Sequence, residues 1–117
     1  MTSTVPTSGS RRTVTKVSKV LEMQNSLGMH ARPAALFVKT ASRFESEIEV
    51  DCDGNCVSGK SIMGLLMLEA QCGAMLKVTA VGSDAAEAIK AIQQLMRYKF
   101  YEDEFAHLLT KDDGKAS

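Results

Sequence analysis

The residues best suited to chemistry in this sequence are a histidine and an arginine two positions apart, His30 and Arg32. Gly28 interrupts the apolar run before them, and Pro33, with its fixed φ and missing N–H, suits the first turn of the alanine-rich segment that follows. His30 is therefore predicted to lie at a helix N-terminus, where backbone N–H groups and the helix dipole favour an anion. Arg32 adds a planar set of donors that matches phosphate.

Two roles for His30 follow from this position. An imidazole is partly unprotonated near neutral pH and is then nucleophilic, so His30 can accept a phosphoryl group covalently as well as bind a phosphate. Taken alone, the same pattern also describes a surface or capping histidine, and Arg32 then becomes a solvated arginine at a helix start. A phosphoramidate keeps a high transfer potential, whereas a serine phosphate ester would hold its group, so a histidine suits a phosphoryl relay.

A second motif, GKSIMGLL at 59–66, places Ser61 thirty-one positions after His30. Together with the HARPA motif at 30–34, it resembles HPr, the family of small histidine-containing phosphocarriers of the bacterial phosphoenolpyruvate-dependent phosphotransferase system (PTS). The resemblance runs from about Lys16 to about Tyr98, with both motifs in the family's order and spacing.

The resemblance to HPr implies a set of functional residues. His30 would take phosphate on Nδ1 from phosphorylated enzyme I and pass it to enzyme IIA components, with Arg32 beside it. Ser61 would carry a regulatory phosphate added by an ATP-dependent HPr kinase/phosphorylase, although an ordinary helix N-cap also explains this serine. The partner contacts implied by the resemblance are Met29, Ala31, Ile62 and Met63.

An alternative hypothesis is a purely regulatory HPr-like protein. Such a protein would act through phosphorylated Ser61 on a kinase, a phosphatase or a transcriptional regulator, without sugar transport. Relatives with only this role lack the histidine, so His30 favours the relay. A plain interaction module without phosphate chemistry would make both motifs coincidental. Under either phosphate hypothesis the chain is a carrier or a regulator and not an enzyme.

The hydrophobic pattern predicts which elements hold these motifs. Strands are expected at 16–23, 47–51, 56–58 and 75–81, and helices from 31 to about 44, from 61 to about 71–73 and from 84 onward. This βαββαβα order predicts an α+β fold with helices on one face of an antiparallel sheet and solvent on the other. It agrees with the HPr-like open-faced β-sandwich, in which three helices cover a four-stranded antiparallel sheet.

The helices are predicted to bury specific faces. In the first, Ala34, Ala35, Val38 and Ala41 recur at helical spacing. Before the last helix, the pair Asp84 and Glu87 resembles a capping box. The predicted buried stripe of that helix comprises Ala85, Ala88, Ile89, Ile92, Leu95 and Met96. Between 62 and 68, six apolar side chains are too many for full burial, so some are expected to form an exposed patch and at least half to be core.

Composition narrows the possible partners. With 117 residues the chain suits one domain, and 14 basic against 14 acidic side chains give no sign of nucleic acid or a membrane as partner. No apolar run is long enough for membrane insertion, so a soluble, cytoplasmic protein is expected. The odd count of three cysteines predicts free thiols, buried or half-buried, in a reducing compartment. No metal site and no cofactor are expected.

The two ends are predicted to lie outside the phosphocarrier domain, which is assigned to 16–99. Residues 1–15, rich in serine and threonine, are expected to form a disordered tail, with an organelle transit peptide as the alternative. Residues 100–117 form a C-terminal extension, expected to be partly frayed. Its apolar residues could prolong the last helix, and His107 is expected at the surface. These apolar residues are Phe100, Phe105, Leu108 and Leu109.

Overall fold

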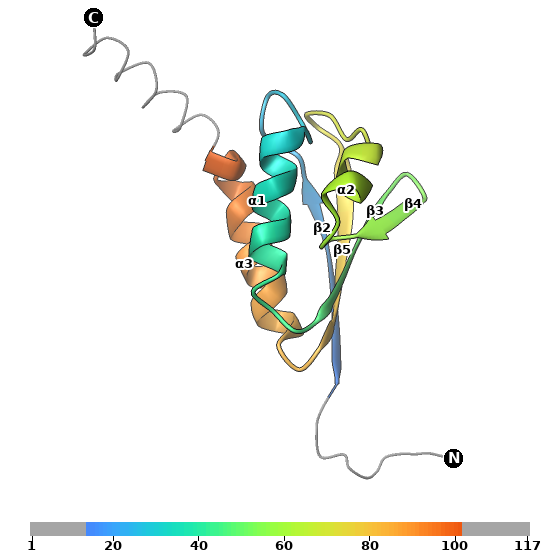
Figure 1. Cartoon of the computed structure of the whole chain (residues 1–117), viewed down its shortest axis with the longest axis vertical. Helices are drawn as coiled ribbons and strands as arrows, with labels where there is room; N and C mark the ends of the chain where they lie inside the picture. Colours follow the sequence, from blue (N-terminus) through green and yellow to red (C-terminus); the bar gives the residue numbers. More distant parts are fainter. Residues whose placement is uncertain (1–13, 102–117) are drawn as a thin grey trace, which may run out of the picture.

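Four antiparallel strands form one sheet in the order β2-β5-β3-β4. The computed structural model describes residues 14–101, so the predictions for 1–13 and 102–117 lie outside the described residues. The strands are β2 (Thr15–Glu22), β3 (Glu47–Cys52), β4 (Asn55–Ser58) and β5 (Met75–Gly82). The helices are α1 (Ala31–Ala41), α2 (Ile62–Met67) and α3 (Ala85–Arg97), followed by the 3₁₀ turn η2 (Lys99–Tyr101). The helices lie on one face of the sheet, which confirms the predicted α+β fold (Figure 1).

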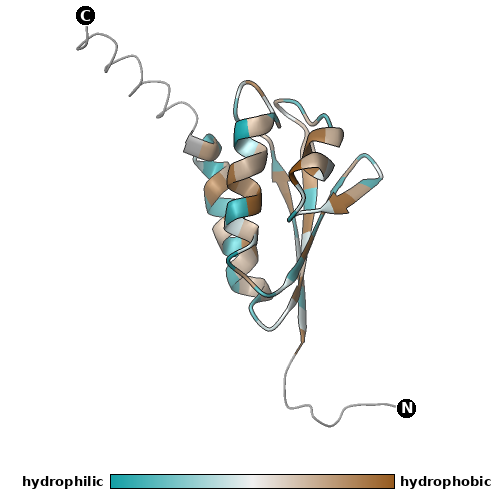
Figure 2. Ribbon diagram, viewed as in Figure 1, coloured by the Kyte–Doolittle hydropathy of each residue, from teal (hydrophilic) through white to brown (hydrophobic). Residues whose placement is uncertain are grey.

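Strict alternation along β3 separates the core from the open face of the sheet. Ile48, Val50 and Cys52 are buried, whereas Glu47 and Glu49 are exposed. A strand turns successive side chains to opposite faces, so the acidic residues must face away from the helices. Along α1 and α3, hydrophobic and hydrophilic residues lie side by side, as expected for helices with one buried face (Figure 2).

The buried face of α1 differs from the prediction. Phe37 is fully buried and Ala35 is exposed, so the prediction was wrong for Ala35 and missed the largest core side chain of the helix. The helix also ends at Ala41 instead of about Phe44. The amides of Arg43 and Phe44 bond to carbonyls three residues earlier, so the last turn tightens and ends the helix.

Helix α2 is shorter than predicted, ending at Met67 instead of near 71–73. Glu69 has a φ of 51°, in the left-handed region that an α-helix cannot continue through. Leu65 and Leu68 are buried and Leu66 packs partly against the core. Of the six apolar residues at 62–68, two therefore belong to the core and a third packs partly against it, fewer than the predicted half.

In α3 the predicted buried stripe is confirmed at all six positions, but the capping box is wrong. The Asp84 carboxylate caps nothing in its own helix and instead accepts hydrogen bonds from the N–H groups of Glu45 and Ser46 and from the Ser46 hydroxyl. It thereby ties the loop after α1 to the start of α3. Local spacing could not reveal this contact because its partners lie almost forty residues away.

The chain beyond α3 does not prolong the helix through Phe100. Lys99 and Phe100 have φ values of 54° and 56°, which end the α-helical path, while the Phe100 ring is fully buried. The other residues of the predicted extension lie outside the described residues.

The three cysteines are free thiols. Only Cys52 is buried, and the expected burial was wrong for Cys56 and Cys72, which are exposed. Cys56 faces the open side of the sheet, where its Sγ lies 3.6 Å from a carboxylate oxygen of Glu49. Burial and the neighbouring Asp53 raise the pKa of the Cys52 thiol.

The Asp84 contacts give a pH-dependent contribution to stability. The hydrogen bonds from Ser46 and Glu45 lower the pKa of this carboxyl below its ordinary value. Asp84 therefore stabilises the fold fully above an ordinary pKa of about 4 and loses this contribution as pH falls through the lower folded value. We expect Asp84→Asn to be less stable than wild type to urea at pH 7, with the difference shrinking below pH 4. Asp53→Asn, in the exposed hairpin turn, is the control; an equal loss in both variants would contradict this role.

Candidate functional site

His30 is the N-cap residue of α1. Its backbone is extended, with φ −125° and ψ −170°, and its carbonyl accepts the first helical hydrogen bond from Ala34 N at 2.9 Å. The imidazole makes no capping hydrogen bond to the helix, which excludes the capping role, and the residue is half-exposed. The ring therefore lies at the head of the helix without capping it.

The first turn of α1 offers a place for an anion next to this ring. In any α-helix the first N–H groups have no carbonyl partner within the helix. Pro33 has no N–H group and has a φ that suits a helix. The N–H groups in the first turn of α1 are therefore those of Ala31 and Arg32. No acidic residue lies in this turn, so α1 itself brings no negative charge against a phosphate. Ala31 is exposed and Arg32 half-buried.

Two loops joined by backbone hydrogen bonds hold His30 in place. Met29 N–H donates to the Ala70 carbonyl at 2.8 Å, and Met23 N–H donates to the Ala74 carbonyl at 2.8 Å. The buried Asn25 side chain donates from Nδ2 to the Gly28 carbonyl at 2.7 Å. The loop before the histidine is thus fixed to the loop that follows α2.

Gly28 is required at the closest point of these loops. Its φ is +72°, and a Cβ at this position would lie 2.6 Å from the Ala70 carbonyl oxygen. The sequence suggested either an unusual backbone conformation or a close approach, and the structure contains both. A side chain here would push apart the segments that hold His30.

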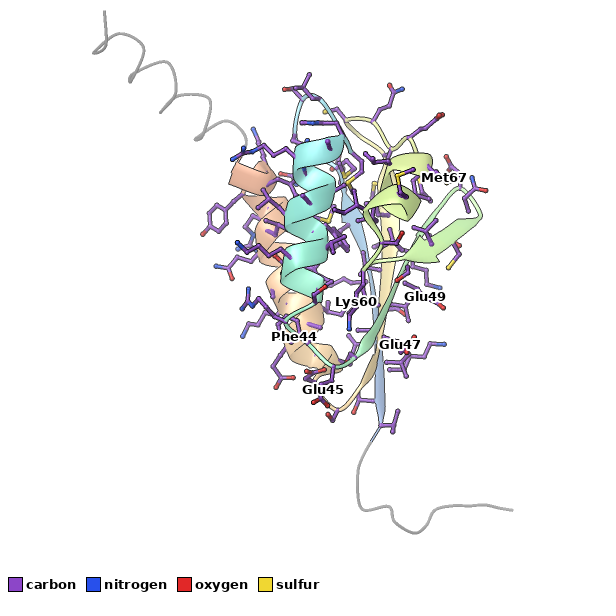
Figure 3. The ribbon with its side chains drawn as sticks, in the orientation of Figure 1. Phe44, Glu45, Glu47, Glu49, Lys60 and Met67 are labelled. Carbon is purple, nitrogen blue, oxygen red and sulfur yellow. The ribbon has the colours of Figure 1, made fainter. Side chains whose placement is uncertain are left out.

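Ser61 is the N-cap residue of α2, as predicted. Its Oγ accepts a hydrogen bond from Gly64 N at 3.0 Å, and the residue is half-exposed. The preceding Lys60 donates from Nζ to the Phe44 carbonyl at 2.8 Å, just beyond the end of α1 (Figure 3).

The structure does not bring His30 and Ser61 to the same helix end. His30 begins α1, whereas Ser61 follows a lysine that is bonded just beyond the other end of α1. The eleven residues of α1 span about 16 Å. The two residues therefore do not share one helix N-terminus as a phosphate site.

An exposed apolar patch on α2 lies directly after Ser61. Ile62, Met63 and Met67 are 41%, 68% and 74% exposed. The sequence singled out Ile62 and Met63 but not Met67, although Met67 follows Met63 at i+4 and so lies on the same helix face. Met29, predicted as a partner contact, is only 6% exposed and belongs to the core, so that prediction was wrong.

Within residues 14–101, no group of three histidine, cysteine, aspartate or glutamate side chains is arranged to hold a metal ion. In the same range, no helix has the length and apolar character needed to cross a membrane.

Comparison with known proteins gives concordant results. Residues 17–97 match the family model described as "PTS HPr component phosphorylation site". The phosphocarrier protein HPr of Treponema pallidum is 44% identical over 87 residues, which cover 74% of this chain and 99% of that protein. The HPr-like protein Crh of Halalkalibacterium halodurans is 45% identical over 76 residues, covering 65% and 90%.

Solved structures agree in fold. The structure of HPr-C-His from Thermoanaerobacter tengcongensis aligns with a TM-score of 0.70 at 48% identity, covering 72% of this chain and 94% of that one. HPr from Bacillus anthracis aligns with a TM-score of 0.67 at 42% identity, covering 69% and 96%.

The close contact at Gly28 predicts that a methyl group added there destabilises the fold more than one added at another glycine with a positive φ. Gly28→Ala should lower the free energy of unfolding by about 3 kcal/mol, because a left-handed φ and a clash with the Ala70 carbonyl coincide. Gly73→Ala, in the facing loop, shares a positive φ but has nothing within 4 Å of its Cβ, so it should lose only about 1–2 kcal/mol. Urea unfolding of both variants measures the difference, and equal losses would show that the contact is unimportant.

Proposed function

The chain belongs to the HPr family of phosphocarrier proteins of the phosphotransferase system, and on that premise we propose that His30 accepts a phosphoryl group from phosphorylated enzyme I and passes it to enzyme IIA components. A carrier of this kind is not itself a catalyst. It would act in the cytoplasm. The observation that best supports the relay is the half-exposed imidazole at the head of α1, next to first-turn N–H groups and Arg32.

The transfer step follows from this geometry. The unprotonated Nδ1 of His30 attacks phosphorus, a P–N bond forms, and the bond to the donor's leaving group breaks. The phosphoryl oxygens then meet the N–H groups of the first turn of α1 and the Arg32 guanidinium, which stabilise their charge. Because the phosphoramidate keeps a high transfer potential, a nucleophile on the next protein can remove the group by the same step in reverse.

Partner docking is assigned to Ala31 and to the exposed patch of Ile62, Met63 and Met67. Methionine side chains are flexible and polarisable, so they pack against differently shaped apolar surfaces. This property suits a carrier that must bind a donor and an acceptor in turn.

The relay is tested by phosphorylating the purified protein with phosphoenolpyruvate and an enzyme I. We expect a mass increase of one phosphate that is lost in acid and absent in His30→Ala. His107→Ala, which removes the chain's other histidine, is the matched control and should be phosphorylated normally. Arg32→Lys keeps the charge but loses the bidentate fork, so its transfer rate should fall about tenfold to a hundredfold. Phosphorylation of His30→Ala at the normal rate would contradict the assignment.

We further propose that Ser61 is phosphorylated by an HPr kinase/phosphorylase. Its hydroxyl is half-exposed at the start of α2, where a phosphate would meet the N–H groups of the first turn, so the fold should survive. The added charge would stand directly beside the apolar patch. Phosphorylation would therefore weaken docking of an acidic partner and slow uptake at the distant His30.

Ser61→Asp tests this inhibition, since aspartate keeps the N-cap and adds one negative charge. We expect phosphorylation of His30 by enzyme I to slow about tenfold at low donor concentration and to recover at saturating donor, because docking rather than chemistry is affected. Ser61→Ala, which loses the cap but adds no charge, should react at the normal rate. A normal rate for Ser61→Asp would contradict the inhibitory role.

A purely regulatory function is the second candidate, favoured by the 45% identity to an HPr-like protein Crh. On this hypothesis phosphorylated Ser61 binds a kinase, a phosphatase or a transcriptional regulator. Acid-stable phosphate on Ser61 from ATP and an HPr kinase, together with none on His30 from enzyme I, would support it over the relay.

A further inference from the structure

A shallow groove lies between α1 and α3 on the solvent side of the two helices. Its apolar floor is formed by Leu36 of α1 and by Ala91 and Leu95 of α3. Two cationic side chains stand along its edge, Lys39 of α1 and Arg43 of the turn that follows α1. An apolar floor with a charged edge fits an amphipathic segment better than a small polar ligand.

The charged side chains that line this groove and the depression beside it are all basic. A second depression continues along α3 and is lined by Lys90 and Arg97. Among the described residues that line the two depressions, four side chains are basic and none is acidic. The surface therefore favours a negatively charged occupant.

The C-terminal end of the described chain lies next to these two helices. After α3 ends at Arg97, the left-handed residues Lys99 and Phe100 turn the chain, and the buried Phe100 ring anchors η2 against α1 and α3. Helices α1 and α3 run in opposite directions, so this exit lies at the end of the helix pair where α1 begins (Figure 1). Sixteen residues follow Tyr101.

The sequence of these sixteen residues complements the groove. It begins with three acidic residues at 102–104, and five acidic against two basic side chains give it a net charge of −3 with a neutral histidine. Phe105, Leu108 and Leu109 follow at i, i+3 and i+4, which is the spacing of one helix face. As a helix, residues 102–109 would span about 12 Å, close to the length of α3 between Lys90 and Arg97.

We propose that residues 102–109 dock into the α1–α3 groove of the same molecule. Phe105, Leu108 and Leu109 cover the apolar floor, and the acidic residues 102–104 face the basic side chains nearer the exit, Lys39 and Arg97. The groove lining begins at Leu36, one turn after Arg32, so docking does not require contact with His30. The proposal goes beyond phosphoryl transfer and does not depend on it.

Amide hydrogen exchange of the full-length chain, followed by NMR, tests this docking. In wild type we expect the amides of Leu108 and Leu109 to exchange about tenfold slower than in Lys39→Glu/Arg97→Glu, the factor for a segment docked about nine-tenths of the time. Lys16→Glu/Lys77→Glu makes the same change of charge on the open sheet face and should leave the exchange as in wild type. Adding Glu102→Lys and Glu104→Lys to the groove variant should restore part of the protection, because opposite charges again face each other.

Three results would overturn the proposal. Unprotected amides at 105–109 in wild type would show that the segment does not dock. Protection that is unchanged in Lys39→Glu/Arg97→Glu would place it elsewhere. Protection that disappears on dilution would mean that the segment binds a second copy of the chain instead of its own groove.

Discussion

The position of His30 depends on one backbone hydrogen bond, from Met29 N–H to the Ala70 carbonyl, which joins the loop before α1 to the loop after α2. The bond can form because Gly28 has no side chain at the point of closest approach. It fixes the residue before the histidine, and Pro33 presets the turn after it. The imidazole is therefore positioned by its backbone on both sides and does not cap the helix.

Ser61 begins α2, whereas His30 begins α1, and Lys60 next to Ser61 bonds just beyond the other end of α1. Water and salt screen an exposed interaction between charges that lie more than about 10 Å apart. Direct repulsion at the histidine is thus a weak means of control. The exposed side chains of Ile62 and Met63 directly follow Ser61, so a partner that covers them must desolvate any phosphate placed there. A phosphate on Ser61 would therefore affect the docking of a partner more strongly than it would affect His30 directly.

Features encoded by local periodicity could be predicted from the sequence. The buried stripe of α3, the alternation along β3 and the N-cap at Ser61 all follow from spacing within one element. Two of the failures involve residues whose partners lie far away along the chain. Asp84 and Glu87 have the spacing of a capping box, but the Asp84 carboxylate bonds to Ser46 across the molecule. Met29 lies beside the histidine in sequence, yet its side chain fills the core. No local pattern distinguishes these outcomes.

The equal numbers of acidic and basic side chains conceal an uneven distribution. On the open sheet face the charges offset one another across strands: Asp51 pairs in register with Lys77, and Lys16 lies in the same row as Glu47. Such cross-strand pairs leave little net field. The groove between α1 and α3 has no acidic side chain among its described lining, so its positive charge is not offset locally. Since the whole chain is neutral, the compensating negative charge must lie elsewhere in the sequence, and the acidic residues 102–104 follow directly after the turn that packs against these helices. Net charge alone therefore predicts partners poorly when opposite charges occupy separate parts of the chain.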